Sequence, residues 1–418
     1  HRPVRHRSAE PDVYRPGRGL AGAGLPLTRI TGQISLRIIQ ILPELNAGGV
    51  ERGTVEFARH LVQTGHESIV ISAGGRMAGR LTDEGSRHIQ MPVHRKRPGS
   101  LRYVRPLRRL LMQLDADIVH LRSRVPAWLT WLAIGRMPRS NRPAIVTTFH
   151  GLYSVNAYSA IMGRGDAVIA ISECVRDYIL ENYPKVPKHK ISVIHRGVDE
   201  TVFNRDFRPS DAWKAAFYAE FPVLRDKPLV LMPGRLSRWK GQEGFINLMA
   251  ILQQRGIDCH GVVVGGPTPG KEAYEKALHS RVTTEGLQDR VTFVGHRSDI
   301  LELYSQGSVV CTLSENPEPF GRTIIEALAL GIPAVAFDVG GPAESLRACL
   351  PQGLAPPGDL QALADRVETM ISNPPGFSLP RQFTLAEQAG KTLAIYRQLL
   401  DSGVKATPTR TGPGTADK

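Results

Sequence analysis

Residues 309–330 read VVCTLSENPEPFGRTIIEALAL and contain the features that decide the fold. The apolar run Val309–Leu313 is typical of a buried strand, the segment rich in Pro and Glu after it is typical of a turn, and the run from about Gly321 is typical of a helix. A strand that leads through a turn into a helix is the repeating unit of a parallel α/β sheet, in which ligands bind at the carboxyl ends of the strands. We therefore expect this turn to face a ligand.

The same alternation of short apolar runs and helical stretches covers most of the chain and pauses only at about Asn204–Lys227. It predicts two sequential, doubly wound α/β domains. The first expected series of strands is Leu36–Leu42, Ser68–Ser72, Asp117–His120, Ala144–Thr148, Ala167–Ile171 and Ile191–Ile194, and the second is Leu229–Met232, His260–Val264, Val291–Val294, Val309–Leu313 and Ala334–Phe337.

These patterns set the expected domain boundaries. We predict a disordered basic tail at 1–34, an amino-terminal Rossmann-like domain at 35–205, a linker at 206–227, a carboxyl-terminal Rossmann-like domain at 228–380, a helix at 381–402 that can pack back on the first domain, and a flexible tail at 403–418.

Composition narrows the class of protein. The chain has 418 residues, 41% of them hydrophobic and 22% charged, as in ordinary globular proteins. Its four cysteines lie far apart, which predicts neither a disulfide framework nor a zinc site and favours a reducing compartment. No run approaches the ~18 apolar residues of a membrane span, and the first 30 residues lack the apolar core of a signal peptide. We expect a cytoplasmic protein.

The formal charge of +14, from 53 basic and 39 acidic residues, indicates an anionic partner. Much of it lies between Gly85 and Leu114, where there is no acidic residue and an apolar strip includes Leu101, Val104, Leu107, Leu110 and Leu111; the cations are Arg87, Arg95, Lys96, Arg97, Arg102, Arg105, Arg108 and Arg109. A basic amphipathic segment predicts peripheral contact with an anionic membrane surface, on the inner face of the cell membrane. A core-packed helix with a solvated face and recognition of a phosphorylated glycan are the alternatives. Without interleaved aromatic residues, we do not expect nucleic-acid binding.

Two loops of the second domain carry the chemistry of a phosphate site. The loop PGRLSRWKG at 233–241 places Arg235 and Lys240 after a strand, where they can hold a diphosphate, although a solvated basic loop would look the same. The amides of Gly321, Arg322 and Thr323 would form an anion site at a helix N-terminus.

Two carboxylates accompany this phosphate site. Glu326 lies one turn into the helix, where it can accept hydrogen bonds from two ribose hydroxyls, and Glu318 can reach sugar hydroxyls. The alternatives are a helix-surface acid and a turn residue.

Taken together, these residues resemble a known family. Glu318 and Glu326, with seven residues between them, flank Pro319-Phe320-Gly321 and precede ALALGIP, which resembles the signature of the retaining glycosyltransferases of family 4. The resemblance extends to Gly295-His296-Arg297, a loop that in the family lies near the nucleobase, and to Gly340-Gly341 with Glu344 after the last strand. The resemblance implies the GT-B fold, in which two Rossmann-like domains face each other across a cleft. It implies that the amino-terminal domain, 35–205, binds the acceptor and that the carboxyl-terminal domain, 228–380, binds the nucleotide-sugar. It also implies catalytic roles for His150, Arg235, Lys240 and Glu318, and donor-binding roles for Gly48, Gly49, Gly265, Arg297, Phe320, Gly321, Arg322, Thr323 and Glu326.

The first domain contributes the Gly48-Gly49 pair after its first strand and His150 after its strand Ala144–Thr148. A glycine pair in a first βα turn is common and a lone His is often structural, but the match of Phe-His-Gly to the family implies that His150 contacts the transferred sugar. His195-Arg196-Gly197-Val198-Asp199 stands where the family often has Pro-Asn-Gly-Val-Asp, which leaves the role of Arg196 open.

No metal or other cofactor is expected, because the nucleotide-sugar is a substrate and Arg235, Lys240 and the helix N-terminus can meet the diphosphate charge. Asp115-Ala116-Asp117 looks like the Asp-X-Asp metal motif of another glycosyltransferase fold, but it precedes a strand and should lie at the amino edge of the sheet.

The sequence thus predicts a retaining, metal-independent, hexosyltransferase-like enzyme that moves a sugar from a nucleotide-sugar, UDP-linked, to a glycan or lipid-linked acceptor in bacterial envelope polysaccharide or lipopolysaccharide synthesis. The alternatives are a phosphorylase or sugar-nucleotide synthase of the same fold, a catalytically silent nucleotide-sugar-binding protein, and a nucleic-acid binder. The donor's nucleobase and sugar, the acceptor and the oligomeric state do not follow from the sequence.

Overall fold

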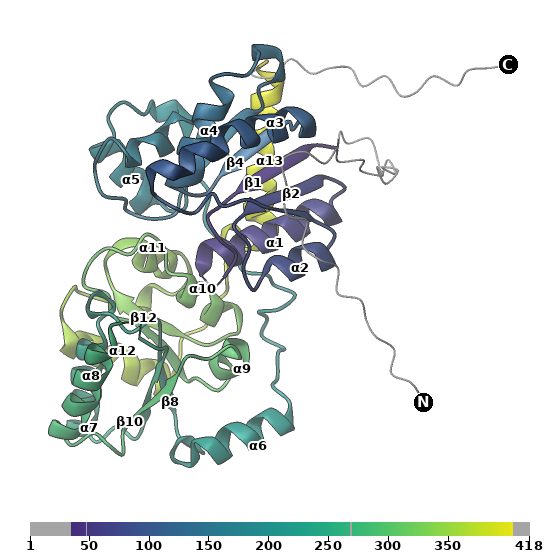
Figure 1. The fold of residues 1–418 in the computed structure, drawn as a ribbon. Coiled ribbons are helices and arrows are strands. Elements are labelled where there is room, and N and C mark those ends of the chain that lie inside the picture. The colour runs from purple at the N-terminus through teal and green to yellow at the C-terminus, as the bar shows by residue number, and fades with distance from the viewer. Residues whose placement is uncertain (1–34, 47, 268–269, 404–418) are drawn as a thin grey trace, which may run out of the picture. The chain divides into compact units, whose positions relative to one another are not determined.

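The computed structural model describes residues 35–46, 48–267 and 270–403, which form two compact units (Figure 1). Unit 1 contains the described residues up to Ala170, then Tyr178–Ile194 and the residues from Ala389 onward, whereas unit 2 contains Ile171–Asp177 and His195–Gln388. The predicted tail at 1–34 and residues 404–418 lie outside the described residues. The change of unit at His195 comes before the expected boundary at residue 205, and the expected linker at 206–227 belongs to unit 2.

Unit 1 is built on a seven-stranded sheet whose paired strands are all parallel. Its spatial order is β3-β2-β1-β4-β5-β6-β7, so the direction of winding reverses between β1 and β4. The strands are β1 (Arg37–Ile41), β2 (Glu67–Ser72), β3 (Arg87–Gln90), β4 (Ile118–Leu121), β5 (Ala144–Phe149), β6 (Ala167–Ala170) and β7 (Ile191–Val193).

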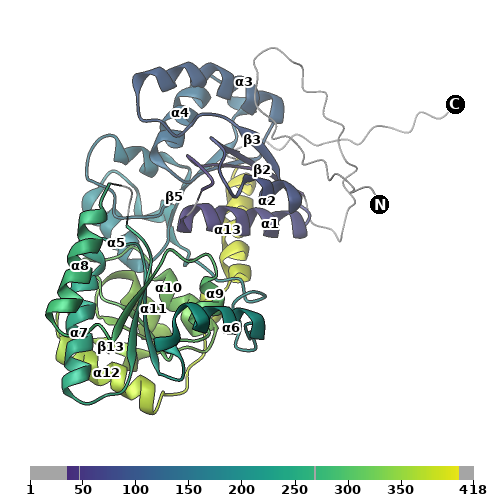
Figure 2. The same ribbon diagram turned by 60° about the horizontal axis from the view of Figure 1, so that its bottom comes forward.

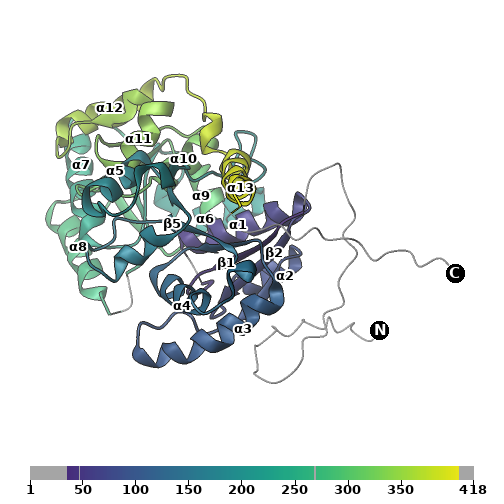
Figure 3. The same ribbon diagram turned by 90° about the horizontal axis from the view of Figure 1, so that it is seen from above.

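Helices cover both faces of this sheet, with α1 and α13 on one face and α3 and α4 on the other (Figure 3). The helices that contribute to unit 1 are α1 (Gly49–Gln63), α2 (Ala78–Asp83), α3 (Val104–Leu114), α4 (Arg124–Ile134), α5 (Glu173–Asn182), α13 (Leu385–Asp401) and the 3₁₀ turns η1 (Pro98–Tyr103), η2 (Arg139–Asn141), η3 (Ser159–Arg164) and η4 (Lys188–Lys190). Both α5 and α13 begin in unit 2 and end in unit 1.

The last helix, α13, is part of the core of unit 1. Ala389, Leu393 and Tyr396 pack with Ile38 of β1 and Phe57 of α1. The Tyr396 hydroxyl lies 2.6 Å from Nδ1 of the fully buried His120, whose Nε2 lies 2.6 Å from the hydroxyl of Thr148. Because a buried polar group is stable only with its hydrogen-bond partners, this chain of contacts fixes α13 on the sheet.

The apolar strip of α3 faces the protein interior. Leu107, Leu110 and Leu111 are at most 1% exposed, which corrects the expectation that this strip forms a membrane-facing surface. Leu101, which precedes the helix in η1, is 57% exposed and is the member of the strip left on the surface. The periodicity of α3 therefore arises from core packing.

Unit 2 has a six-stranded parallel sheet of order β10-β9-β8-β11-β12-β13, which reverses between β8 and β11. Helices α7 and α12 pack against each other, as do α10 and α11 (Figure 2). The strands are β8 (Leu229–Pro233), β9 (His260–Val264), β10 (Val291–Gly295), β11 (Val309–Thr312), β12 (Ala334–Phe337) and β13 (Leu354–Ala355). The helices are α6 (Asp211–Glu220), α7 (Gln242–Gln254), α8 (Glu272–Thr284), α9 (Ile300–Tyr304), α10 (Arg322–Ala329), α11 (Gly340–Cys349) and α12 (Leu360–Ser372), with 3₁₀ turns η5 (Pro222–Leu224), η6 (Arg238–Lys240), η7 (Pro351–Gly353) and η8 (Arg381–Phe383).

Candidate functional site

The predicted phosphate loops of unit 2 meet where the winding of its sheet reverses. Strands β8 and β11 are direct neighbours, with Val230 paired to Val309 and Leu231 to Val310. The loops that follow them therefore leave the sheet side by side at its carboxyl edge. In open parallel sheets this reversal point is where ligands bind, because the two loops diverge to opposite faces and leave room between them.

The two loops are joined by an ion pair. Lys240 Nζ lies 2.6 Å from Oε2 of Glu318, whose side chain is only 7% exposed. The other carboxylate oxygen, Oε1, accepts a hydrogen bond from the hydroxyl of Ser314. Both oxygens of Glu318 thus have a partner, and the carboxylate holds the ammonium group of Lys240 at a fixed position at the sheet edge.

Arg235 contributes the second cation of this edge. Its side chain is exposed and has no ion pair among the residues that the structure describes. Its backbone is held by Gln242, which is 1% exposed and donates from Nε2 to the Arg235 carbonyl at 3.1 Å. Gln242 and Ser314 are two positioning residues that the sequence analysis missed. Each stands next to charged residues or glycine, in or beside a turn, so neither stood out as a buried polar residue.

The start of α10 lies beside these cations. The helix begins at Arg322 with Gly321 as its N-cap, close to the predicted start, so the amides of its first turn lie at the carboxyl edge of β11. The Thr323 hydroxyl is 3.4 Å from that of Thr312. Glu326, which was predicted to bind ribose, is 4% exposed and accepts a hydrogen bond from Arg322 Nε at 2.7 Å. A ribose would therefore meet a carboxylate that Arg322 already orients.

Phe320 and Gly265, both predicted to bind the donor, have packing roles in the structure. Phe320 is 7% exposed, and its ring centroid lies 6.5 Å from that of His195 and 6.4 Å from that of Phe383. Gly265 has φ +149°, and a Cβ atom there would lie 2.0 Å from the carbonyl oxygen of Gly234. Glycine at this position lets the ends of β8 and β9 approach each other.

Arg297, predicted to lie near the nucleobase, binds two carboxylates of unit 2. Its Nη2 lies 2.5 Å from Asp299 and its Nη1 lies 3.2 Å from Glu220 at the end of α6. The hydrogen bond from Arg297 lowers the pKa of Asp299, which also accepts a hydrogen bond from the indole of Trp213. These contacts fix α6 to the loop after β10, and a role at the nucleobase stays a prediction.

Glu344 on α11, which the resemblance also singled out, holds His195 and the start of α5. Its carboxylate lies 2.5 Å from His195 Nε2 and accepts the backbone N–H groups of Glu173 and Cys174. Burial opposes ionisation of Glu344, but these hydrogen bonds outweigh it and lower its pKa.

Gly48, Gly49 and His150 belong to unit 1. Gly48 is the N-cap of α1 with φ +155°, and α1 begins at Gly49, directly beyond the loop that follows β1. His150 follows β5, and its backbone N–H donates to the hydroxyl of Tyr153 at 3.2 Å. Both positions are at the carboxyl edge of the sheet of unit 1, as predicted.

Asp115 and Asp117 lie at the opposite edge of that sheet. Asp115 ends α3 in the left-handed conformation, with φ 44°, and Asp117 precedes β4 and accepts the backbone N–H of Arg37 at 2.7 Å. Their place is that of a loop into a strand, as the sequence indicated. Among the described residues, no group of three or more His, Cys, Asp or Glu side chains could hold a metal ion.

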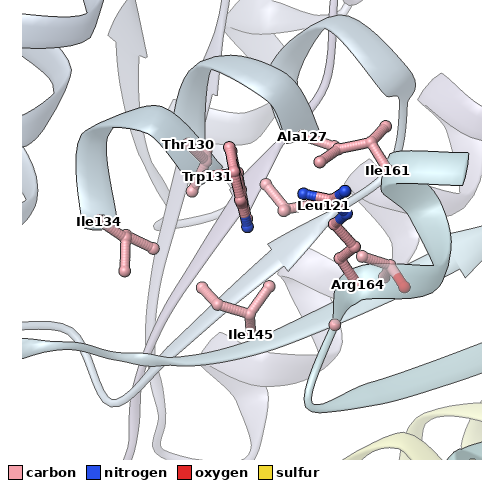
Figure 4. Close-up of a pocket in the computed structure, with 10 residues that line it drawn as sticks. Leu121, Ala127, Thr130, Trp131, Ile134, Ile145, Ile161 and Arg164 are labelled. Atoms are coloured by element: carbon pink, nitrogen blue, oxygen red, sulfur yellow. The ribbon is translucent and has the colours of Figure 1, made fainter. Parts of the chain in front are cut away.

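A small apolar cavity in unit 1 is lined by none of the predicted site residues (Figure 4). Its volume of about 40 Å³ lies between α4, β4, β5 and η3, and its lining includes Thr130, Trp131 and Arg164. The guanidinium of Arg164 lies over the Trp131 ring, 4.7 Å from the centroid. The space holds little more than a water molecule, so it is no site for a sugar.

Two family models match the chain. The model described as "Glycosyltransferase Family 4" matches residues 47–202, and the one described as "Glycosyl transferases group 1" matches residues 217–389. A lipopolysaccharide core biosynthesis mannosyltransferase, LpsB of Rhizobium meliloti, is 28% identical over 251 residues, which cover 57% of this chain and 68% of that protein.

Solved structures match over most of the described chain. A glycosyltransferase from Rickettsia africae is 29% identical with a TM-score of 0.76, and the match covers 88% of this chain and 100% of that one. HepE from Anabaena in complex with UDP-glucose is 22% identical with a TM-score of 0.66, covering 88% of this chain and 99% of that one. From its sequence and its two parallel sheets alike, the chain belongs to the group 1 glycosyltransferases of family 4 and has the GT-B fold.

Proposed function

We propose that this glycosyltransferase takes a sugar from a nucleotide-sugar bound by unit 2 and transfers it, with retention of configuration, to a glycan or lipid-linked acceptor. The observation that carries the proposal is the placement of Arg235 and Lys240 on the loop after β8, at the winding reversal of unit 2, where Lys240 pairs with Glu318 of the loop that leads into α10. Two cations and a helix N-terminus at one edge suit a diphosphate.

In the proposed reaction the bond between the sugar carbon and the diphosphate oxygen breaks, and negative charge grows on the leaving phosphate. Lys240 and Arg235 stabilise that charge, which lowers the barrier because the cations are already in place before the reaction. They supply the positive charge that the diphosphate needs, so no metal takes part in the proposal. Arg322 and Glu326 lie beside the phosphates, where the carboxylate orients the ribose.

Retention follows in this proposal from attack on the face that the phosphate leaves. Glu318 is engaged by Lys240 and Ser314, so it serves to hold Lys240 and to contact sugar hydroxyls instead of forming a covalent bond to the sugar. The leaving phosphate then accepts the proton of the acceptor hydroxyl as the new glycosidic bond forms. His150 of unit 1 is proposed to contact the transferred sugar.

The donor and pathway are proposed from relatives. The Rhizobium relative acts in lipopolysaccharide core synthesis by its name, which supports an acceptor in envelope lipopolysaccharide or polysaccharide. HepE holds UDP-glucose, and on the strength of the shared fold we propose a UDP-linked donor.

A screen of UDP-, GDP- and ADP-sugars by thermal shift and by donor hydrolysis, with and without chelator, tests the proposal. We expect one nucleotide series to raise the melting temperature saturably, and one sugar donor to be hydrolysed slowly at a rate that the chelator does not change. Stabilisation without hydrolysis or transfer would favour a silent nucleotide-sugar-binding protein, and phosphate-dependent release of sugar 1-phosphate would favour a phosphorylase.

We also propose that η1 and α3 of unit 1 contact an anionic membrane surface. Leu101 and Met112 are 57% and 43% exposed, and the cations Arg102, Arg105 and Arg109 are exposed around them. No helix among the described residues is long and apolar enough to cross a bilayer. In this proposal, contact rests on charge and on these two apolar side chains, and the surface contacted is the inner face of the cell membrane.

Replacing Arg105 and Arg109 together by glutamine is expected to lower partition onto vesicles containing phosphatidylglycerol about thirtyfold, since each cation near anionic lipid contributes about 1 kcal/mol. Co-sedimentation at low and high salt measures the change. The matched control replaces Lys271 and Lys276, two exposed lysines at the start of α8 in unit 2, by glutamine. Equal losses in the two double variants would show that only net charge matters and would contradict the proposed surface.

A further inference from the structure

The winding of unit 1 also reverses, between β1 and β4, and the loop after β4 lies at that point. Residues 122–124 of this loop read Arg-Ser-Arg, a pair of cations that the sequence analysis did not single out. The second of them, Arg124, is the first residue of α4, and the N-cap Ser123 forms no side-chain cap. An anion is favoured at such a helix start, where unpaired amides and the helix dipole point outward.

The guanidinium of Arg124 is held by groups from another loop. Its Cζ lies 4.7 Å from the ring centroid of Tyr153 and 5.5 Å from that of Tyr158, and its Nη1 donates to the Ser159 hydroxyl at 3.1 Å. From the loop after β3, Lys96 Nζ lies 4.1 Å from the same Tyr158 ring. Three loops of the carboxyl edge thus bring two cations and two tyrosines together.

No carboxylate of the described residues balances these two charges. Neither Lys96 nor Arg124 takes part in an ion pair within the part of the chain that the structure describes. From Gly85 to Gly165 the sequence contains only two acidic residues, Asp115 and Asp117, and both lie at the amino edge of the sheet. Two like charges that share one aromatic ring therefore leave a net positive site that a bound anion would stabilise.

Tyr153 connects this site to His150, which is predicted to contact the transferred sugar. The Tyr153 ring lies under Arg124, and its hydroxyl accepts the backbone N–H of His150 at 3.2 Å. Burial raises the pKa of Tyr153, so its hydroxyl stays neutral and keeps this hydrogen bond. A ligand anchored at Arg124 would thus have its neighbouring atoms close to His150.

We propose that Lys96 and Arg124 bind an anionic group, a phosphate or a carboxylate, carried by the acceptor saccharide, with Tyr153 and Tyr158 beside its sugar ring. This inference rests on the proposed function, since it assumes that unit 1 binds the acceptor. It adds that the acceptor is itself charged, so that unit 1 selects it by charge as well as by shape.

Calorimetric titration of the full chain tests the proposal in the presence of a saturating concentration of the nucleoside diphosphate that stabilises it most, which occupies the donor site. Glucose 6-phosphate, glucuronate and glucose are the three probes. We expect at least one anionic sugar to bind about tenfold or more tightly than glucose, as a charge-assisted hydrogen bond contributes about 1.5–3 kcal/mol. Whichever of glucose 6-phosphate and glucuronate binds more tightly shows whether the site prefers a phosphate or a carboxylate.

Lys96→Met and Arg124→Met are each expected to weaken binding of that anionic sugar about tenfold and to leave nucleotide affinity unchanged. Arg124→Lys should retain part of the affinity for the sugar. Arg136→Met is the matched control, because this exposed arginine lies just beyond the other end of α4. Equal binding of glucose and both anionic sugars, or an equal loss in Arg136→Met, would overturn the inference. Failure of every nucleotide to bind would instead overturn the proposed function, and the sugar titration without nucleotide would still report on Lys96 and Arg124.

Discussion

Lys240→Met is expected to lower turnover about 100- to 1,000-fold, the size of effect seen when one preplaced group that stabilises transition-state charge is removed. The ammonium of Lys240 is held 2.6 Å from Glu318 at the carboxyl edge of β8, so it needs no rearrangement to meet the leaving phosphate. The loss should fall mainly on kcat, because charge on the phosphate grows only as the glycosidic bond breaks. Initial rates of donor hydrolysis and of transfer measure it.

Two further variants separate this effect from a loss of folding. Arg238→Met removes a cation from the same loop, but its side chain is 80% exposed and lies 3.4 Å from the half-buried Glu243, so turnover should stay within about twofold of the wild type. Lys240→Met combined with Glu318→Gln removes the buried charge that the single variant leaves without its partner. If the double variant recovered wild-type turnover, Lys240 would be a structural residue and the assignment of the site would fail.

Gly265→Ala is expected to destabilise the protein by about 3 kcal/mol or more, the range reached when a residue is forced into a strained backbone conformation against fixed neighbours. The new Cβ would lie 2.0 Å from the Gly234 carbonyl oxygen. That oxygen is a backbone atom at the end of β8, and the Cβ is bonded directly to the backbone at the end of β9, so the clash cannot be relieved without moving one of the two strands. The change in the midpoint of urea unfolding reports the cost.

Gly256→Ala is the matched control for this substitution. Gly256 also has a positive φ, +72°, but no atom lies within 4 Å of the position of its Cβ. It should therefore cost only the conformational penalty of about 1–2 kcal/mol. Similar losses in the two variants would mean that the close approach of Gly265 to Gly234 contributes nothing.

The sequence predicted the fold well where strands are apolar. Every expected strand is present within one or two residues of its predicted ends. The two strands that were missed lack the usual signal: β3 reads RHIQ, with three charged or polar residues in four, and β13 has two residues. Both lie at the edge of a sheet, where fewer side chains are buried. Helix α6 was missed because the prolines around it at 209 and 222 indicated a linker.

The amphipathic periodicity of α3 led to the expectation of a membrane-facing apolar strip, whereas the strip packs inside unit 1. The spacing of Leu107, Leu110 and Leu111 is the same whether a helix lies on a bilayer or on its own sheet, because the pattern records only that one face avoids water. Which apolar surface covers that face depends on the rest of the fold, and here it is the core of unit 1. The arginines on the outer face were located correctly.

The sequence predicted which loops form the site, because loops that follow parallel strands lie at the same edge of the sheet. Residues after β8 and β11 were expected at one edge, and the adjacency of these strands brings Lys240 and Glu318 into contact. The partners were beyond prediction, because they depend on side-chain packing: nothing in the sequence pairs Glu318 with Ser314, or Arg297 with Glu220. Arg124 was missed because a single charged residue at the start of a helix carries no periodic signal.

The position of α13 has a consequence for biosynthesis. The strands of unit 1 leave the ribosome before those of unit 2, but the hydrophobic core of unit 1 includes Leu393 and Tyr396. Domains usually fold one after another as the chain emerges, with the earliest domain first. In this chain the core of unit 1 cannot be completed first, because residues 195–388 are synthesised before α13. In nascent chains that end before residue 389, we expect unit 2 to resist protease and the sheet of unit 1 to be cleaved.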